Sequence, residues 1–395
     1  MSLNAFGNAL GISLQLDIPH DVFSTLRIDE GTKLLLDHLP QEEPTSVLDM
    51  GCGYGALGLP IAARFPEAQV DLVGRDLLAV HWAAENAQKN NLKNVRVLGS
   101  LGFRDLTEKV ERDKKYDWIL CNVPARIGRS FIKHLVEEGC ARLAPHGTLR
   151  LVVIRDLAPV IEEVSKGFSG SLTEIARGPR HVVFGIQPDS GARSNSNITL
   201  SVPDLETLYL RDTVSVGGLE LERPFDLGGD DPQRLSKGLP LLFDALPRQA
   251  PSQVLCFRCG YGALPLFSLV KWPQAHVLAT DRDLLATTFT RRNAQRLSLQ
   301  SDRLSVREGV SLNETLKYGE SFDLVIGELS PSAGERVAKS ELEAIARSLK
   351  PGGQALILAL DKLVKEWVKP SKVPSGGVSV HTLMSREGYT VLFMS

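Results

Sequence analysis

The sequence predicts two doubly wound α/β domains in tandem, each built on a mostly parallel sheet that closes with an antiparallel hairpin. Three observations support this fold class. The chain repeats itself internally, strand patterns alternate with segments of helical period, and each copy carries a glycine-rich turn between its first strand and the next helix. Strands that alternate with helices indicate a parallel sheet covered on both faces.

The internal repeat sets the domain organisation. Residues 47–87 align without a gap with residues 254–294, a shift of 207 positions, and 19 of the 41 aligned positions are identical. A chain of 395 residues also suits two domains of about 170 to 200 residues. We therefore expect an N-terminal domain over 1–190, a linker and β lead-in over 191–224, and a C-terminal domain over 225–395.

The first copy is expected to alternate strands with helices. A β-rich lead-in at 12–18 and a helix at 29–39 precede the repeat. The remaining elements are strands at 46–50, 69–74, 95–99, 116–122 and 148–154, a helix ending at 65, helices at 77–90 and 131–143, and a closing strand pair at 171–178 and 181–186.

The second copy follows the same plan after a connecting region. The polar stretch 189–197 is expected to be a linker or exposed loop. Three segments look like strands between the domains: 198–202, 206–212 and 219–225. The strand patterns that close the second copy lie at 349–360, 378–385 and 389–395.

Composition indicates a soluble globular protein, with 43% hydrophobic and 23% charged residues. No apolar run approaches the roughly 18 residues of a membrane span, and the N-terminus lacks a secretory pattern, so we expect a cytoplasmic location. A net charge of −2 gives no support of its own to a nucleic-acid partner. Cys256 and Cys259 form a CxxC, but no second pair stands at metal-ligand spacing, so no metal site is expected.

The glycine turn of copy one runs from Asp49 to Gly55. Gly51, Gly53 and Gly55 allow a ligand to approach the backbone, with the following helix N-terminus facing it. An acid two residues before the first glycine would repel a pyrophosphate, whereas it suits the ammonium and sulfonium groups of S-adenosylmethionine. We expect this loop, including Cys52, to bind that cofactor. A dinucleotide site and a turn without ligand remain the alternatives.

The aligned loop of copy two looks disabled for this cofactor. Cys256 replaces the acid, and Arg258 stands where copy one has Gly51, adding bulk and positive charge where a cation should sit. Copy two nevertheless keeps Asp281 at the end of its second strand, the usual place of an acid that binds ribose hydroxyls.

Copy one has glycine, Gly74, at that ribose-binding position. Asp76, two residues later, is the candidate ribose ligand, and a helix N-cap is its alternative role. Ser100, which follows the third strand, is expected to lie near the adenine.

The whole chain resembles the class I S-adenosylmethionine methyltransferases, specifically the tandem-domain guanine-N2 enzymes of the ribosomal RNA small subunit methyltransferase C family and their relatives that act on the large subunit. Residues 22–36 are similar to that family's VFS…D-x-G-T…LL signature, and the loop from Asp49 to Gly55 and the segment after the fourth strand also match. The resemblance implies two Rossmann-like methyltransferase domains, S-adenosylmethionine as cofactor, and ribosomal RNA or an assembled ribosomal particle as partner. We expect a monomer, because the tandem pair of domains can replace a dimer. We also expect no membrane attachment.

The chain departs from this family at two points. The relatives use their C-terminal copy for chemistry, whereas here the N-terminal loop is the better preserved. Amino-methylating enzymes carry Asn-Pro-Pro-aromatic after the fourth strand, whereas copy one has Asn122-Val123-Pro124-Ala125 and copy two has Glu328-Leu-Ser-Pro331.

The resemblance implies that Asn122 and Pro124 are the catalytic residues. The Asn122 side-chain carbonyl and the Val123 backbone carbonyl can accept the two hydrogens of an exocyclic amine and aim its nitrogen at the methyl group. Arg126 and Arg129 follow directly and are expected to contact phosphate beside the target base.

Alternatives to this function remain open. Without the stacking aromatic, the acceptor need not be RNA, and Asn122 can be read as a turn residue after a strand. Both copies have lost expected site residues: copy one lacks the ribose acid, copy two has an altered loop, and the acceptor motif is incomplete in both. This pattern is also compatible with a non-catalytic, methyltransferase-like RNA-binding protein.

Overall fold

The computed structural model describes residues 10–19, 28–106, 114–166, 168–189, 205–225, 227, 237–300, 302–330, 334–367 and 379–395. Four of the sequence predictions lie outside these residues: the part of the lead-in signature at 22–27, the linker at 190–197, the strand at 198–202, and Pro331.

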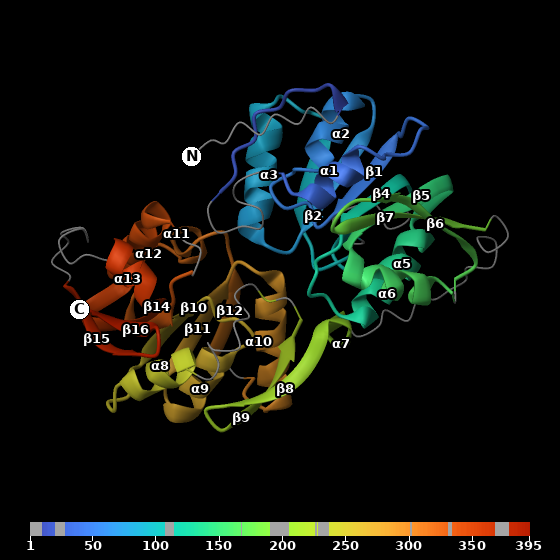
Figure 1. The fold of residues 1–395 in the computed structure, drawn as a ribbon. Coiled ribbons are helices and arrows are strands. Elements are labelled where there is room, and N and C mark those ends of the chain that lie inside the picture. The colour runs from blue at the N-terminus through green and yellow to red at the C-terminus, as the bar shows by residue number, and fades with distance from the viewer. Residues whose placement is uncertain are drawn as a thin grey trace. The chain divides into compact units, whose positions relative to one another are not determined.

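The chain divides into two compact units, Met1–Leu210 and Arg211–Ser395 (Figure 1). Each unit contains one seven-stranded sheet, with strand order β3-β2-β1-β4-β5-β7-β6 in the first and β12-β11-β10-β13-β14-β16-β15 in the second. In both sheets the first five strands are parallel, and the last two pairings, β5–β7 and β7–β6 or β14–β16 and β16–β15, are antiparallel. The predicted fold class, two mostly parallel α/β sheets with closing antiparallel strands, is confirmed.

The strands of the first unit match the sequence prediction closely. They are β1 (Ser46–Met50), β2 (Gln69–Gly74), β3 (Val95–Gly99), β4 (Tyr116–Asn122), β5 (Leu143–Ile154), β6 (Gly170–Arg177) and β7 (His181–Pro188). The helices are α1 (Glu30–Leu36), α2 (Gly58–Arg64), α3 (Leu77–Lys89), α5 (Arg129–Ala141), α6 (Ala158–Ser165) and α7 (Leu205–Tyr209), with a short 3-10 turn η2 (Arg155–Leu157).

The second unit repeats the arrangement behind a two-stranded hairpin. Its strands are β8 (Leu210–Val216), β9 (Leu219–Pro224), β10 (Gln253–Phe257), β11 (His276–Asp281), β12 (Leu304–Glu308), β13 (Phe322–Glu328), β14 (Leu349–Leu360), β15 (Val380–Arg386) and β16 (Tyr389–Met394). Its helices are α8 (Leu239–Ala245), α9 (Ala263–Lys271), α10 (Leu284–Arg296), α11 (Leu312–Thr315), α12 (Glu335–Ser348) and α13 (Asp361–Trp367).

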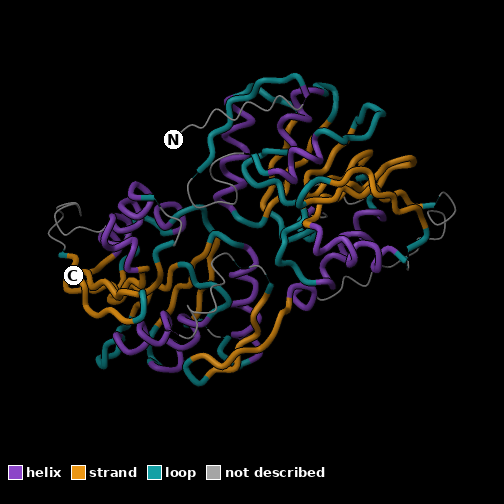
Figure 2. The backbone as a smooth tube through the Cα atoms, viewed as in Figure 1, coloured by secondary structure: helices purple, strands orange, loops and turns teal. Residues whose placement is uncertain are grey.

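Burial on both faces explains why the central strands read as continuous apolar runs. In β1, Val47 and Leu48 are fully buried although they point to opposite faces of the sheet. Helices pack against the strands within each unit, as the purple and orange segments of Figure 2 show. In the described part of the chain, no helix is both long and apolar enough to cross a membrane.

The lead-in at 12–18, expected to be β-rich, forms no strand. Side chains of α3 and of its C-cap residue satisfy its backbone instead. Asn90 bonds the N–H and carbonyl of Gln15 at 3.0 and 2.9 Å, and Asn86 bonds those of Asp17 at 2.7 and 3.0 Å. These side-chain amides supply the hydrogen bonds that a neighbouring strand would otherwise provide, so the backbone of the segment is satisfied outside a sheet.

The strand expected at 206–212 is also partly wrong. Its first residues belong to helix α7, and β8 begins only at Leu210. The Tyr209 ring lies 4.7 Å from the Phe131 ring of α5, measured between centroids, so the end of this segment packs against a helix.

The strand order of the first unit reverses between β1 and β4. Connections leave β1 towards β2 on one side, while β4 lies on its other side. In open parallel sheets, ligands bind beyond the carboxyl ends of the strands at such a reversal point. The carboxyl ends of β1 and β4 carry Asp49 and Asn122, and Asp49 pairs in register with Leu120.

Candidate functional site

The loop between β1 and α2 uses three glycines in the left-handed region. Their φ angles are +81° at Gly51, +55° at Gly53 and +95° at Gly55. A Cβ atom at Gly51 or Gly53 would meet nothing within 4 Å, whereas one at Gly55 would lie 2.4 Å from Leu59 Cδ1. Gly55 is therefore required by packing, and Gly51 and Gly53 border open space.

The first N–H groups of this loop are already used. Gly51 and Cys52 both donate to the Val73 carbonyl at 2.9 Å, which ties the loop to β2. The Cys52 side chain is buried, and burial raises the pKa of its thiol. Of the predicted cofactor residues, Gly51 and Cys52 thus shape the loop rather than offer hydrogen-bond donors.

Asp49 is buried, with an exposed fraction of 1%, beneath the start of α2. Its Oδ2 accepts from the Gly58 N–H at 2.8 Å. Burial raises the pKa of Asp49 to about 7, and the Gly58 hydrogen bond only partly offsets this. A nearby cation would favour the ionised form, so the site is suited to a positively charged group.

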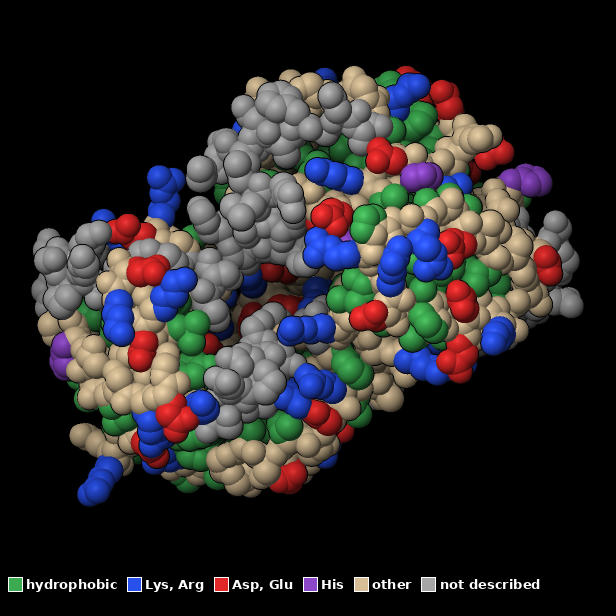
Figure 3. All heavy atoms as spheres, in the orientation of Figure 1, with side chains coloured by type: hydrophobic (Ala, Val, Ile, Leu, Met, Phe, Trp, Pro, Cys, Tyr) green, Lys and Arg blue, Asp and Glu red, His purple; other side chains and the backbone are tan. Residues whose placement is uncertain are grey.

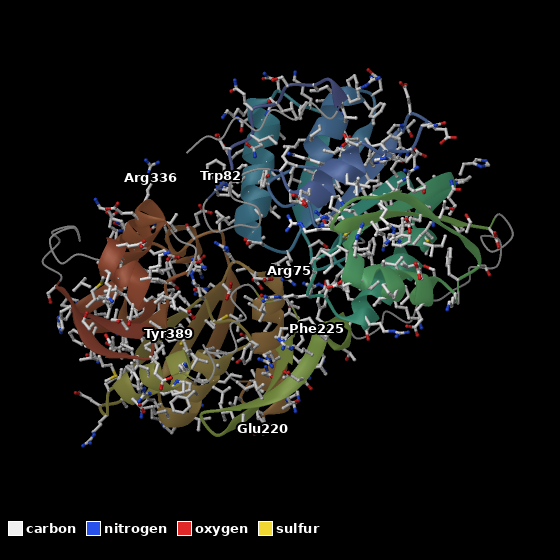
Figure 4. The ribbon with its side chains drawn as sticks, viewed as in Figure 1. Arg75, Trp82, Glu220, Phe225, Arg336 and Tyr389 are labelled. Atoms are coloured by element: carbon white, nitrogen blue, oxygen red, sulfur yellow. The ribbon has the colours of Figure 1, made fainter. Side chains whose placement is uncertain are left out.

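A side chain at the end of β2 would be tightly packed. A Cβ atom at Gly74 would lie 3.2 Å from Val80 Cγ2 and 3.4 Å from Cys52 Sγ. Asp76 caps α3, accepting from the Leu78 N–H at 3.0 Å, and follows Arg75, which Figure 4 labels. The N-cap role of Asp76 is therefore present in the structure, and its role towards a ribose stays a prediction.

Ser100 is buried directly after β3. Its hydroxyl donates to the Gly102 carbonyl at 2.8 Å and accepts from the Asp105 N–H at 3.2 Å. The Asp105 carboxylate in turn accepts from the Leu101 N–H at 3.0 Å. Ser100 therefore braces this turn, and its proximity to an adenine stays a prediction.

Asn122, the last residue of β4, is held by α1. Its Nδ2 lies 3.1 Å from both carboxylate oxygens of Asp29 and 3.0 Å from Thr32 Oγ1. From the sequence, Asp29 and Thr32 are only signature residues without a role at the site. The sequence signal that pointed to their role is Asp29 itself. The local helix pattern explains an acid at this position only as an N-cap.

The residues after Asn122 turn outward. Val123 is buried and donates its N–H to the Val152 carbonyl at 2.9 Å, whereas Pro124, Ala125 and Arg126 are exposed. Arg129 begins α5 and pairs with Glu163 of α6 at the surface. The structure thus places the two arginines on the exposed side of the motif.

Tyr54 is a buried residue of the glycine loop. The ring is buried between Gly53 and Gly55, and its hydroxyl has no hydrogen-bond partner among the described residues. Burial raises the pKa of Tyr54, and the negative charge of Asp29 raises it further. Because β1 and β4 pair in parallel, the glycine loop and Asn122 follow the strands at the same edge of the sheet.

Copy two keeps the shape of this loop and fills it with its own side chains. Arg258 adopts φ +49° at the position of Gly51, and its Nη2 donates to Glu341 Oε1 of α12 at 2.6 Å. Asp281 Oδ2 accepts from the Gly260 N–H at 3.0 Å. Arg258 and Asp281, at the positions of Gly51 and Gly74, therefore already have partners within copy two.

The described residues of the fourth-strand motif of copy two are buried. Glu328 and Ser330 are 7% and 5% exposed.

The basic and acidic groups drawn in Figure 3 are interspersed over the visible face, in keeping with a net charge of −2. The described surface on this face therefore lacks a broad field of one sign.

Comparison with curated proteins finds relatives over part of the chain. A ribosomal RNA small subunit methyltransferase C from Hahella chejuensis is 36% identical over 149 residues, which is 37% of this chain and 42% of the relative. A ribosomal RNA large subunit methyltransferase G from Shewanella pealeana is 32% identical over 152 residues, 37% of each chain. These matches thus span less than half the length of either relative.

A solved structure matches nearly the whole chain. It is the T. thermophilus 16S rRNA N2 G1207 methyltransferase in complex with AdoMet and guanosine, with a TM-score of 0.61 and 21% identity over 97% of this chain and 95% of the other. At this identity the match establishes a shared fold.

The family comparison covers most of both units. The model of the methyltransferase small domain matches residues 13–184 and again residues 232–392. The two matches coincide with the two sheets and with the two glycine loops described above. The chain therefore belongs to the methyltransferase small domain family and carries two copies of that domain in tandem.

Proposed function

We propose that this protein is an S-adenosylmethionine-dependent methyltransferase that modifies the exocyclic N2 amine of a guanine in ribosomal RNA. Membership of the methyltransferase small domain family supports the reaction class. The names of the relatives and the guanosine complex of the T. thermophilus enzyme support the acceptor. We assign the chemistry to the N-terminal domain, residues 1–190, and not to residues 225–395.

The orientation of Asn122 carries this proposal. Hydrogen bonds from its Nδ2 to Asp29 and Thr32 direct the side-chain carbonyl away from that pair. Among the described residues, no donor reaches Asn122 Oδ1 or the Val123 carbonyl. Two carbonyls at the end of β4 are thus available for the two hydrogens of an amine.

The loop of copy one fits the cofactor. Gly51 and Gly53 border space that a Cβ atom would enter without contact, and the Tyr54 hydroxyl is buried without a partner in the described residues. When bound, S-adenosylmethionine supplies an electrophilic methyl group on a sulfonium. The proposed contacts are the glycine loop with Asp49, Gly51, Cys52, Gly53 and Gly55, Asp76 for the ribose, and Ser100 beside the adenine.

The protein's own residues then orient the acceptor. Asn122 and Val123 accept the amine hydrogens, and Pro124 stiffens the exposed turn that follows. Arg126 and Arg129 contact phosphate beside the base, with Arg129 exchanging its partner Glu163. No base is required, because the amine proton leaves to water after transfer.

Calorimetric titration of the intact chain with S-adenosylmethionine tests the cofactor site. Gly51→Arg copies into the first loop the residue that copy two carries, and Arg258 shows that this loop accepts arginine at positive φ. We expect one site per chain, lost in Gly51→Arg and retained in the matched control Arg258→Gly. A site that survives Gly51→Arg contradicts the assignment to copy one, and no binding to the unmodified chain favours the non-catalytic alternative.

Transfer of labelled methyl groups tests the acceptor. Purified ribosomal RNA, small ribosomal subunits and large ribosomal subunits are supplied separately, and the modified nucleoside is identified after digestion. Label on guanine N2 supports the proposal. The exposed Ala125 offers no ring for stacking, so label confined to a protein or small molecule would support a non-RNA acceptor instead.

We also propose that the protein acts as a cytoplasmic monomer. Light scattering with and without RNA measures the oligomeric state, and a dimer in solution would contradict this part of the proposal.

A further inference from the structure

The side-chain amide of Asn122 is part of a closed hydrogen-bond network with α1. Asp29 caps this helix, accepting from the Gly31 and Thr32 N–H groups at 2.8 and 3.1 Å. Thr32 Oγ1 donates to Asp29 Oδ2 at 2.6 Å. Asn122 Nδ2 reaches both partners, 93 and 90 residues away in sequence. One short turn therefore both starts a helix and holds the end of β4.

The chemistry of the partners fixes which way Asn122 points. An ionised carboxylate only accepts hydrogen bonds, and the Thr32 proton is already directed at Asp29. Both groups therefore present lone pairs to Asn122, so its NH₂ group must face them and its carbonyl must face away. With an alanine at position 29, the amide would have no such preference.

The negative charge of Asp29 also acts on the far end of the amide. Hydrogen bonds from an N–H to a carboxylate are charge-assisted and polarise the donor group. In an amide this polarisation increases the negative charge on the carbonyl oxygen, which makes Oδ1 a stronger acceptor. Asp29 and Thr32 thus set the direction of the Asn122 carbonyl, and Asp29 also increases its strength as a hydrogen-bond acceptor.

An internal comparison links the three residues. The shift of 207 positions that aligns Gly31 with Gly238 places Ser236 at the position of Asp29 and Leu239 at that of Thr32. The last residue of β13, Glu328, occupies the position of Asn122. Copy two, which has lost the asparagine, has also lost both side chains that hold it, while the helix itself persists as α8.

We propose that Asp29, assisted by Thr32, is a positioning residue that orients and polarises Asn122 for the methyl acceptor. This inference rests on the proposed function of Asn122. Asp29 does not contact the acceptor itself and acts only through the Asn122 amide.

The test uses Asp29→Asn in the full-length protein. Asparagine is also a good N-cap, so α1 keeps its cap while the acceptor-only carboxylate is lost. Two readouts are taken: the ¹⁵N–¹H resonances of the Asn122 side-chain amide, assigned with Asn122→Ala, and kcat and KM for methyl transfer. Asp283→Asn, at the cap of α10, serves as the control for a lost cap carboxylate.

We expect Asp29→Asn to shift the Asn122 amide resonances and to lower kcat by about 10- to 100-fold, as for other residues that orient a functional ligand. Affinity for S-adenosylmethionine should stay unchanged. In the Asn122→Ala background, Asp29→Asn should have no further effect, because residues that act as a unit are not additive. Thr32→Ser, which keeps the hydroxyl, should retain activity that Thr32→Val loses.

Unshifted amide resonances, an unchanged kcat, or additive losses in the double variant would each overturn the proposal. If the unmodified protein transfers no methyl group, the proposed function fails, and the amide resonances still decide whether Asp29 holds Asn122. If Asp283→Asn lowers kcat as much as Asp29→Asn, general loss of a helix cap explains the effect and the proposal falls.

Discussion

The side-chain amide of Asn86 donates to the backbone carbonyl of Tyr54 at 3.0 Å, and Asn293 makes the same contact with Tyr261 at 2.8 Å in the second copy. Both asparagines are fully buried and also bond a lead-in segment, through Asp17 in one copy and Glu222 in the other. One repeated residue therefore ties the glycine loop and the lead-in to a helix. The contact is kept in copy two, where Cys256 and Arg258 replace Asp49 and Gly51, so it does not depend on those residues and has a structural role.

Asn86→Ala should destabilise the first unit by about 2–4 kcal/mol, because three hydrogen bonds of about 1 kcal/mol each are lost and buried partners remain unsatisfied. It should also weaken binding of S-adenosylmethionine, since the loop loses its anchor. Asn293→Ala should produce the same destabilisation in the second unit. Urea unfolding and calorimetry measure the two effects, and equal losses of cofactor affinity in both variants would contradict the assignment to copy one.

Asp49 should make the stability of the cofactor-free protein depend on pH. Its pKa is raised from 3.8 to about 7 on folding, so the folded state binds the proton more tightly than the unfolded state. The corresponding stability is fully present below pH 3.8 and is lost as pH rises through about 7, a change on the order of 4 kcal/mol. Asp49→Asn keeps an acceptor for Gly58 and should lack this decline. Parallel unfolding series at several pH values compare the two proteins.

The same group should couple cofactor binding to protons. A cation beside Asp49 favours the ionised carboxylate, so the affinity for S-adenosylmethionine should rise as pH increases through about 7 and then level off. Binding below pH 7 should release a proton, which calorimetry in buffers of different ionisation enthalpy detects. An affinity that is independent of pH in this range would place the cofactor's cationic groups away from Asp49.

Ala125→Phe should improve the acceptor site. Ala125 is exposed, so a ring can be added without displacing the core, and base–aromatic stacking contributes about 1–3 kcal/mol. We expect KM for the RNA to fall by roughly 5- to 140-fold with little change in thermal stability. Ser130→Phe is the control, because Ser130 is also exposed but lies outside the motif. If KM rises in Ala125→Phe, the acceptor does not stack at this position.

Much of the fold could be predicted because the relevant signals are local. The strands at 46–50, 69–74, 95–99 and 116–122 match the structure to the residue, since parallel strands buried on both faces give short apolar runs between turns. The prediction of a strand at 12–18 was wrong because the structure of this segment depends on long-range contacts. Its pattern suits a strand, but asparagine side chains from α3 satisfy its backbone, and no local pattern reveals that.

The sequence by itself determined the duplication, the two α/β sheets and the loop of three glycines, because hydrophobic period and turn chemistry act over a few residues. Only the tertiary structure decided that Asp49 is buried with a raised pKa, that Asp76 caps α3, and that Asp29 meets Asn122. The physical reason is that burial and hydrogen-bond partners depend on which elements pack together. Residues 93 positions apart become neighbours only when the strand order brings α1 to the end of β4.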